Sequence, residues 1–113
     1  MKAKILYVED DRAHQDLIRA YLGSHVELTV VSNKEEFDRL ADSFSLIICD
    51  GQIVGWPNHF DEVVKKFSCE VVMFSSLGLS DLNAFVQKGA RAVFQKNPDD
   101  TKKLVSFIKS LVN

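Results

Sequence analysis

The segment ILYVEDD, residues 5–11, places a short apolar run directly before three acidic residues. Residues 5–8 have the length and the apolar character of a buried strand, and a helical pattern starts soon after Asp11. Neighbouring carboxylates repel one another, so Glu9, Asp10 and Asp11 together call for a compensating group. The segment therefore predicts a buried strand that ends in an acidic turn, with a cation or a shared proton nearby.

The rest of the chain repeats this alternation of short apolar runs and helical segments. We expect strands at residues 5–8, 26–31, 45–49, 70–74 and 92–94, each followed by a helix. Ser32 and Glu35 have the spacing of a capping box. The helices after the first, second, third and fifth strands are expected to bury apolar stripes: Leu17, Ile18, Tyr21 and Leu22; Phe37, Leu40 and Ala41; Phe60, Val63, Val64 and Phe67; Leu104, Val105, Ile108 and Leu111.

Five such strand–helix units predict an α/β fold with a parallel sheet covered by helices on both faces. Right-handed crossovers leave few topologies, of which the flavodoxin-like strand order 2-1-3-4-5 is the commonest. We therefore expect residues 1–113 to form one domain, a flavodoxin-like (βα)5 three-layer sandwich.

Charge and composition exclude several classes of function. The 14 basic and 16 acidic residues give a formal net charge of −2, which does not favour nucleic acid or an acidic membrane surface. No stretch has the length of a membrane span or a signal-peptide core, so a cytoplasmic location is expected. Cys49 and Cys69 have no CxxC spacing and are interpreted as small buried residues in a reducing compartment.

Polar side chains stand at four of the predicted strand ends. In the expected strand order, Glu9 and Asp10 after the first strand meet Asp50 after the third, where ligands bind in such sheets. Ser75 follows the fourth strand and Lys96 the fifth. Converging carboxylates are costly without a cation, and an all-oxygen ligand set favours Mg²⁺. The sequence therefore predicts a magnesium site with Lys96 as an additional positive charge.

Simpler interpretations apply to some single residues. Asp10 or Asp11 can cap the following helix, and for Asp11 we prefer that role, although capping accounts for neither Asp50 nor Lys96. His14 is expected to be a surface residue rather than a ligand. For Trp56 we favour packing over the sheet edge, with an exposed anchor for a partner protein as the alternative.

The motifs VEDD, LIICD, VVMFSS and VFQK, in this order along the chain, resemble the receiver domain of two-component response regulators. The likeness extends over residues 2–112. It implies that Asp50 accepts a phosphoryl group and that Ser75 and Lys96 contact it. It also implies that Glu9, Asp10, Asp50 and the backbone carbonyl of Gln52 surround the Mg²⁺ ion.

The resemblance also implies a signalling role. A receiver takes its phosphoryl group from a histidine kinase or a phosphotransfer protein and catalyses its own phosphorylation and dephosphorylation. A downstream protein target is expected to bind the surface formed by residues 79–88, 92–94 and 99–111. Leu77, two residues after Ser75, is a candidate shield of the phosphoryl group against water.

Two departures from the family leave an alternative open. Val93 stands where receivers usually have an aromatic switch residue, and Phe94 is expected to face the other side of the sheet. Lys96-Asn97-Pro98 replaces the family's Lys-Pro pair, so this loop either takes a different path or stores the strain of a cis bond, about 3 kcal/mol. The alternative function is a degenerate receiver that acts as a constitutive protein-interaction module. A flavin carrier is disfavoured because the carboxylates would repel a flavin phosphate.

Overall fold

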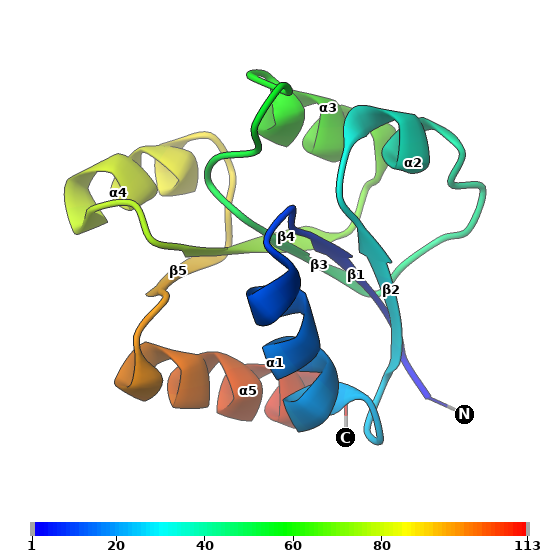
Figure 1. Ribbon diagram of the computed structural model, residues 1–113, viewed down its shortest axis with the longest axis vertical. Helices are drawn as coiled ribbons and strands as arrows, with labels where there is room; N and C mark the ends of the chain where they lie inside the picture. The colour runs from blue at the N-terminus through cyan, green and yellow to red at the C-terminus, as the bar shows by residue number, and fades with distance from the viewer. Residues whose placement is uncertain (1, 113) are drawn as a thin grey trace.

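The computed structural model, which describes residues 2–112, is a five-stranded parallel sheet between two layers of helices (Figure 1). The strands run in the order β2-β1-β3-β4-β5, which confirms the predicted flavodoxin-like α/β topology. In chain order the elements are β1 (Lys4–Val8), α1 (Arg12–Leu22), β2 (Glu27–Val31), α2 (Lys34–Asp38), β3 (Leu46–Cys49), α3 (His59–Lys66), β4 (Glu70–Ser75), α4 (Leu79–Gln87), β5 (Ala92–Gln95) and α5 (Pro98–Val112).

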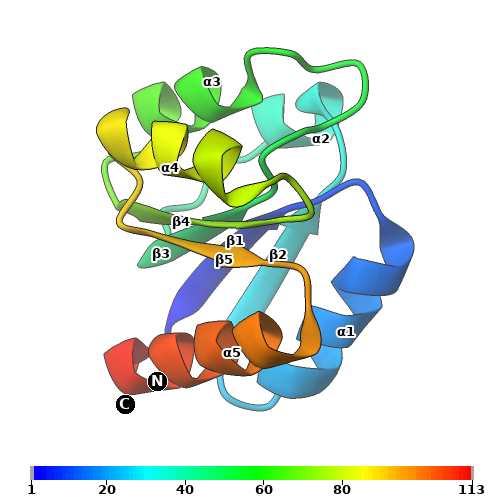
Figure 2. The ribbon, with the colours of Figure 1, turned by 90° about the vertical axis from the view of Figure 1, so that its left-hand side faces the viewer.

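Helices α2, α3 and α4 cover one face of the sheet, and α1 and α5 cover the other (Figure 2). Successive residues of a strand point to opposite faces, so each inner strand contributes to two apolar cores. In β1, Leu6 and Val8 pack under α2–α4, whereas Ile5 and Tyr7 pack against α1 and α5. Burial on both faces accounts for the continuous apolar runs that were read as parallel strands.

The predicted stripe of α1 is only half correct. Ile18 and Leu22 are fully buried with Gln15, but Leu17 and Tyr21 keep 38% and 40% of their surface exposed. A helix on a sheet buries a stripe little wider than a quarter turn, and the row Gln15, Ile18 and Leu22 occupies it. Leu17 and Tyr21 lie on the adjacent flank and form part of a groove toward the start of α5.

The predicted capping box of α2 is wrong by one residue. The N-cap is Asn33, whose Oδ1 accepts the backbone N–H of Glu36 at 2.9 Å. Glu36 in turn accepts the backbone N–H of Ser32 through Oε1 at 2.6 Å, so Glu35 takes no part. The helix is also shorter than predicted, and Ala41 beyond its end is exposed.

Three other side chains are less buried than predicted. Val64 on α3 and Leu111 on α5 are exposed on the outer sides of their helices, and Cys69 is half-buried, whereas Cys49 is buried. These positions lie at the margin of a helix stripe or just before a strand, where the local pattern does not fix how much the neighbours cover. No helix of residues 2–112 is both long and apolar enough to span a lipid bilayer.

Candidate functional site

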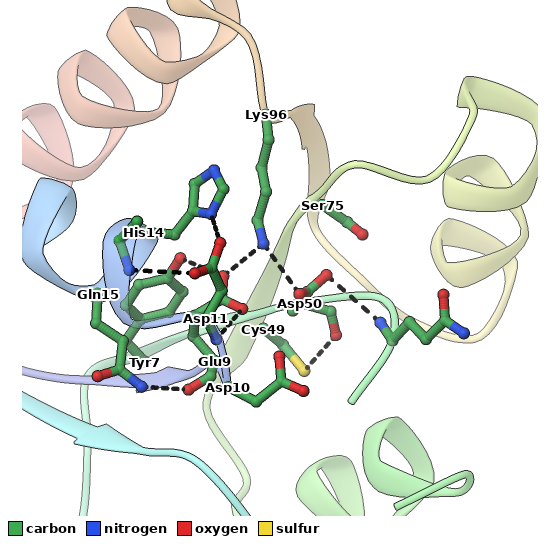
Figure 3. A network of polar contacts seen from close by, with 12 residues as sticks. Tyr7, Glu9, Asp10, Asp11, His14, Gln15, Cys49, Asp50, Ser75 and Lys96 are labelled. Carbon is green, nitrogen blue, oxygen red and sulfur yellow. Dashed lines mark hydrogen bonds and ion pairs between the residues drawn. The ribbon is translucent and has the colours of Figure 1, made fainter. Parts of the chain in front are cut away.

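The predicted site residues converge at the carboxyl edge of the sheet (Figure 3). Glu9 follows β1, Asp50 follows β3, Ser75 ends β4 and Lys96 follows β5. Carboxylate oxygens of Glu9, Asp10 and Asp50 lie within 4.8 Å of one another. Three acidic side chains from two separate loops therefore form one cluster, as the strand order predicts.

Lys96 bridges two members of this cluster. Its Nζ is 2.6 Å from Oε1 of Glu9 and 3.0 Å from Oδ2 of Asp50, and its side chain is only 5% exposed. Hydrogen bonds between buried ionised groups are short and strong, but removing one partner leaves the other charge buried and uncompensated. Lys96 thus holds the carboxylates of two loops at a fixed separation.

The loop that carries Lys96 differs from the family's Lys-Pro arrangement and contains no cis peptide bond. Every peptide bond in residues 2–112 is trans, so the Lys96–Asn97 bond is not the cis bond considered above. Asn97 instead begins α5: its Oδ1 accepts the N–H of Asp100 at 2.8 Å, and its carbonyl accepts the N–H of Thr101 at 2.9 Å. The inserted residue therefore caps the helix, and Pro98 occupies its first position.

Tyr7 belongs to the buried part of the site and was not among the predicted site residues. Its hydroxyl donates to Oε1 of Glu9 at 2.7 Å, and the N–H of Asp11 lies 3.2 Å from Oε2. Burial and the neighbouring Glu9 raise the pKa of Tyr7, so the hydroxyl stays protonated and serves as a donor. A signal was present, because residues two apart on a strand face the same side and an aromatic hydroxyl there reaches the next carboxylate.

The carboxyl groups of the cluster differ in their affinity for protons. Burial raises the pKa of Glu9 to about 7, although the Lys96 ammonium opposes this shift. Burial acts in the same direction on Asp50, but the neighbouring Ser75, Glu9 and Lys96 outweigh it and hold its pKa below the usual range. Burial lowers the pKa of Lys96, but the carboxylates of Glu9 and Asp50 outweigh burial and raise it above the usual value. At neutral pH, Asp50 and Lys96 are ionised and Glu9 is close to its midpoint.

The cluster suits a divalent cation. Three carboxylates and one ammonium sum to a formal charge of −2 when all are ionised, which one divalent ion neutralises. All three side chains offer oxygen atoms, the donors that Mg²⁺ prefers. Asp10 lies at the outer side of the cluster, where its Oδ2 accepts the N–H of Val54 at 3.0 Å. The contribution of the Gln52 carbonyl stays a prediction; the N–H of Gln52 is 3.4 Å from Oδ1 of Asp50.

Ser75 and Leu77 lie beside the segment that follows β3. Ser75 is buried, and its Oγ accepts the backbone N–H of Leu77 at 3.3 Å. A Cβ atom added to Gly51 would lie 2.6 Å from Cδ1 of Leu77 and 3.1 Å from Oγ of Ser75. Both side chains therefore pack on the backbone that follows Asp50, and a larger residue at position 51 would require the end of the Leu77 side chain to shift.

Trp56 is buried and holds the loop that follows Asp50 against α2 and α3. This confirms the prediction that Trp56 packs in the fold and is not an exposed anchor for a partner. It is 3% exposed, its ring lies 5.0 Å from that of Phe37, and its Nε1 donates to Oε2 of Glu62 at 2.7 Å. Lys34 on α2 contacts the other oxygen of Glu62 at 2.5 Å. The loop is thereby joined to both α2 and α3.

Asp11 and His14 stand apart from the cluster. Oδ1 of Asp11 accepts the N–H of Ala13 at 3.1 Å, so Asp11 caps α1 as predicted. Its other oxygen contacts Nδ1 of His14, and this contact lowers the pKa of Asp11. His14 is thus engaged by Asp11 and not by the carboxylates of the cluster.

Comparison with known proteins extends the fold assignment. No family model and no curated protein matches the sequence. The response regulator DrrB of Thermotoga maritima, an OmpR/PhoB homolog, is similar in structure with a TM-score of 0.81 and 17% identity; the match covers 98% of this chain and 52% of DrrB. A two-component response regulator of Clostridium difficile gives 0.80 and 14%, covering 97% of this chain and 95% of the other.

A structure described as an adenylate cyclase from Rhodopirellula baltica is also similar, with a TM-score of 0.73 and 19% identity over 97% of this chain and 89% of that one. The chain thus has the fold of response regulator receiver domains across its length. At these identities the likeness concerns the fold, and a fold serves several functions. Any conclusion about activity depends on the residues of the site.

Proposed function

We propose that residues 1–113 form a phosphoacceptor receiver domain of a two-component phosphorelay in the cytoplasm. Asp50 accepts the phosphoryl group, and Ser75 and Lys96 contact its oxygens. The observation that carries the proposal is the cluster at the carboxyl edge, in which Lys96 bridges Glu9 and Asp50 beside Asp10. A purely structural sheet edge gains little from three clustered carboxylates of which a buried lysine contacts two.

Asp50 is suited to the nucleophilic role. Its pKa is held below the usual range, so its carboxylate is ionised at neutral pH. An oxygen of Asp50 attacks phosphorus, the bond from phosphorus to the donor's imidazole nitrogen breaks, and the imidazole leaves with the electron pair of that bond. Such a transfer depends mainly on in-line positioning and charge neutralisation. The ammonium of Lys96 already lies 3.0 Å from Asp50 and provides a fixed positive charge.

Glu9, Asp10, Asp50 and the carbonyl of Gln52 would hold Mg²⁺ in this site. When bound, the ion would neutralise charge on the carboxylates and on the phosphoryl oxygens. Ser75 donates its hydroxyl hydrogen to a phosphoryl oxygen, while its Oγ accepts the backbone N–H of Leu77 at 3.3 Å. A shift of Ser75 toward the phosphoryl group therefore moves the loop between β4 and α4 with it and couples phosphorylation to the adjoining surface.

The signalling partners follow from this chemistry. The phosphoryl donor is a histidine kinase or a phosphotransfer protein, and the downstream protein target binds the face formed by α4, β5 and α5. Leu79 and Val86 are exposed on α4, and Phe94 packs on Phe107 beside Lys102 and Lys103 on α5. This face combines apolar and basic groups, which suits a protein partner. Neither nucleic acid nor a membrane is proposed as a direct partner.

A second function is favoured by one observation. Val93 packs toward α2–α4 and Phe94 toward α1 and α5, as strand alternation predicts, so no aromatic side chain of β5 faces α4. A receiver without an aromatic switch there can act as a constitutive interaction module. This alternative keeps the fold and the partner face but assigns no role to phosphorylation.

Labelling of the acceptor separates the two functions. The chain is incubated with Mg²⁺ and acetyl phosphate, and the intact mass is measured for the wild type, for Asp50→Asn and for Asp16→Asn, an exposed control on α1. We expect the gain of one phosphoryl group in the wild type and the control, and none in Asp50→Asn. Trp56 fluorescence on addition of beryllofluoride gives a second readout. A folded wild type that acquires neither adduct would reject the phosphoacceptor and favour the interaction module.

A further inference from the structure

His59 is a buried histidine to which the proposed chemistry assigns no role. It is the first residue of α3 and is 3% exposed. Its Nε2 lies 2.6 Å from the backbone carbonyl oxygen of Asp50. A carbonyl oxygen only accepts hydrogen bonds, so Nε2 carries the proton and donates it. A side chain of α3 thereby binds the backbone of the proposed acceptor residue.

The hydrogen bond acts on the segment that shapes the site. The C=O and N–H groups of a trans peptide point in opposite directions, so holding the Asp50 carbonyl toward α3 orients the whole Asp50–Gly51 peptide. The next amide, that of Gln52, lies 3.4 Å from Oδ1 of Asp50. The position of the Gln52 backbone relative to the acceptor carboxylate thus depends on the peptide that His59 holds.

His59 is itself held from the opposite side. Its ring meets that of Trp56 edge to face at 5.9 Å, and Glu62, one turn further along α3, accepts the indole N–H. Residues 51–55 therefore lie between two attachments to α3, one at the Asp50 carbonyl and one at Trp56. Cys49 adds a weaker contact from Sγ to the same carbonyl at 3.3 Å.

From this geometry we infer that His59 is a positioning residue, whose Nε2–H holds the segment 50–52 in the arrangement that binds Mg²⁺ and presents Asp50 to the donor. The inference rests on the proposed function. Residues that orient metal ligands typically change metal affinity or activity about 10- to 100-fold when they are replaced. Because His59 does not touch the reacting atoms, its effect comes entirely through the backbone of Asp50.

Two substitutions separate the hydrogen bond from the packing. His59→Gln places an amide N–H near the position of Nε2, whereas His59→Leu fills similar space without a donor. His25→Gln, at the exposed turn before β2, is the control. Calorimetric Mg²⁺ titration without a phosphodonor and the rate of labelling by acetyl phosphate are measured for each folded variant. We expect at least about a tenfold loss in both for His59→Leu, with His59→Gln and His25→Gln close to the wild type.

Each outcome bears on the inference. Wild-type behaviour of a folded His59→Leu would overturn it, and so would an equal loss in His59→Gln and His59→Leu. If the wild type neither binds Mg²⁺ nor becomes labelled, the proposed function itself fails. NMR of the ring nitrogens in the wild type provides a test that needs no variant: we expect Nε2 to carry a slowly exchanging proton, and a ring protonated only at Nδ1 would overturn the inference.

Discussion

Replacing Lys96 by methionine would measure how much its buried ammonium group contributes to the free energy of unfolding. Methionine keeps much of the apolar stem but removes the ammonium that contacts Glu9 at 2.6 Å and Asp50 at 3.0 Å. Both carboxylates then remain buried without their counter-charge. Removing one partner of a buried ion pair typically costs about 3–5 kcal/mol, so we expect a loss of this size in the free energy of unfolding without metal.

The loss is expected to depend on pH. The pKa of Glu9 is already raised to about 7 in the wild type, and without Lys96 it rises further. A carboxyl group whose pKa is higher in the folded than in the unfolded state stabilises the fold only while it is protonated. That stabilisation is complete below the unfolded pKa and disappears as the pH rises through the folded value. The deficit of Lys96→Met should therefore be smaller near about pH 5, where only Asp50 has lost its counter-charge, than near about pH 9, where ionised Glu9 has lost it too.

Urea unfolding with a chelator, followed by circular dichroism at both pH values, measures this difference. Lys103→Met is the matched control: Lys103 is 72% exposed and 3.8 Å from Asp100, so its loss should cost less than about 1 kcal/mol at either pH. A Lys96→Met protein as stable as this control, or a deficit that does not grow with pH, would refute the electrostatic role assigned to the buried cluster.

Three further predictions concern the metal, the acceptor and the loop. Mg²⁺ affinity should decrease as the pH falls through about 7, because a proton on Glu9 competes with the ion; calorimetric titrations that give one affinity across this range would contradict it. Leu77→Asn should shorten the lifetime of phosphorylated Asp50, because Leu77 packs over Gly51 and shields the acceptor from water; an unchanged half-life, followed by intact mass, would count against shielding. Trp56→Ala should lower the free energy of unfolding by about 3–5 kcal/mol because the ring is buried, and a urea midpoint within error of the wild type would disprove this.

The elements of the fold were predictable because their patterns are local. The inner strands of the sheet are buried on both faces and appear as uninterrupted apolar runs. Each predicted strand lies within about one residue of the observed one. The helix faces were less predictable. Leu17 and Tyr21 are as apolar as the buried residues of α1, but only the packing of α1 on the sheet decides which row is covered.

The capping error at α2 has a similar origin. Ser32 and Asn33 are both good N-cap residues, each followed three positions later by a glutamate. The end of β2 at Val31 and the hydrogen bond of Glu36 to the N–H of Ser32 select the second pair. Local propensity alone does not distinguish two adjacent caps of equal quality.

The strands, the helices and the side chains at the carboxyl edge could be predicted from the sequence, because strand and helix periods and the ends of apolar runs are visible in neighbouring residues. The strand order followed from the preference for right-handed crossovers. Three contacts became apparent only in the folded chain: Lys96 lies between Glu9 and Asp50, Tyr7 donates to Glu9, and His59 binds the carbonyl of Asp50. These contacts join residues brought together by packing. Hydrogen bonds and buried ion pairs depend on distances of a few tenths of an ångström, which no local pattern encodes.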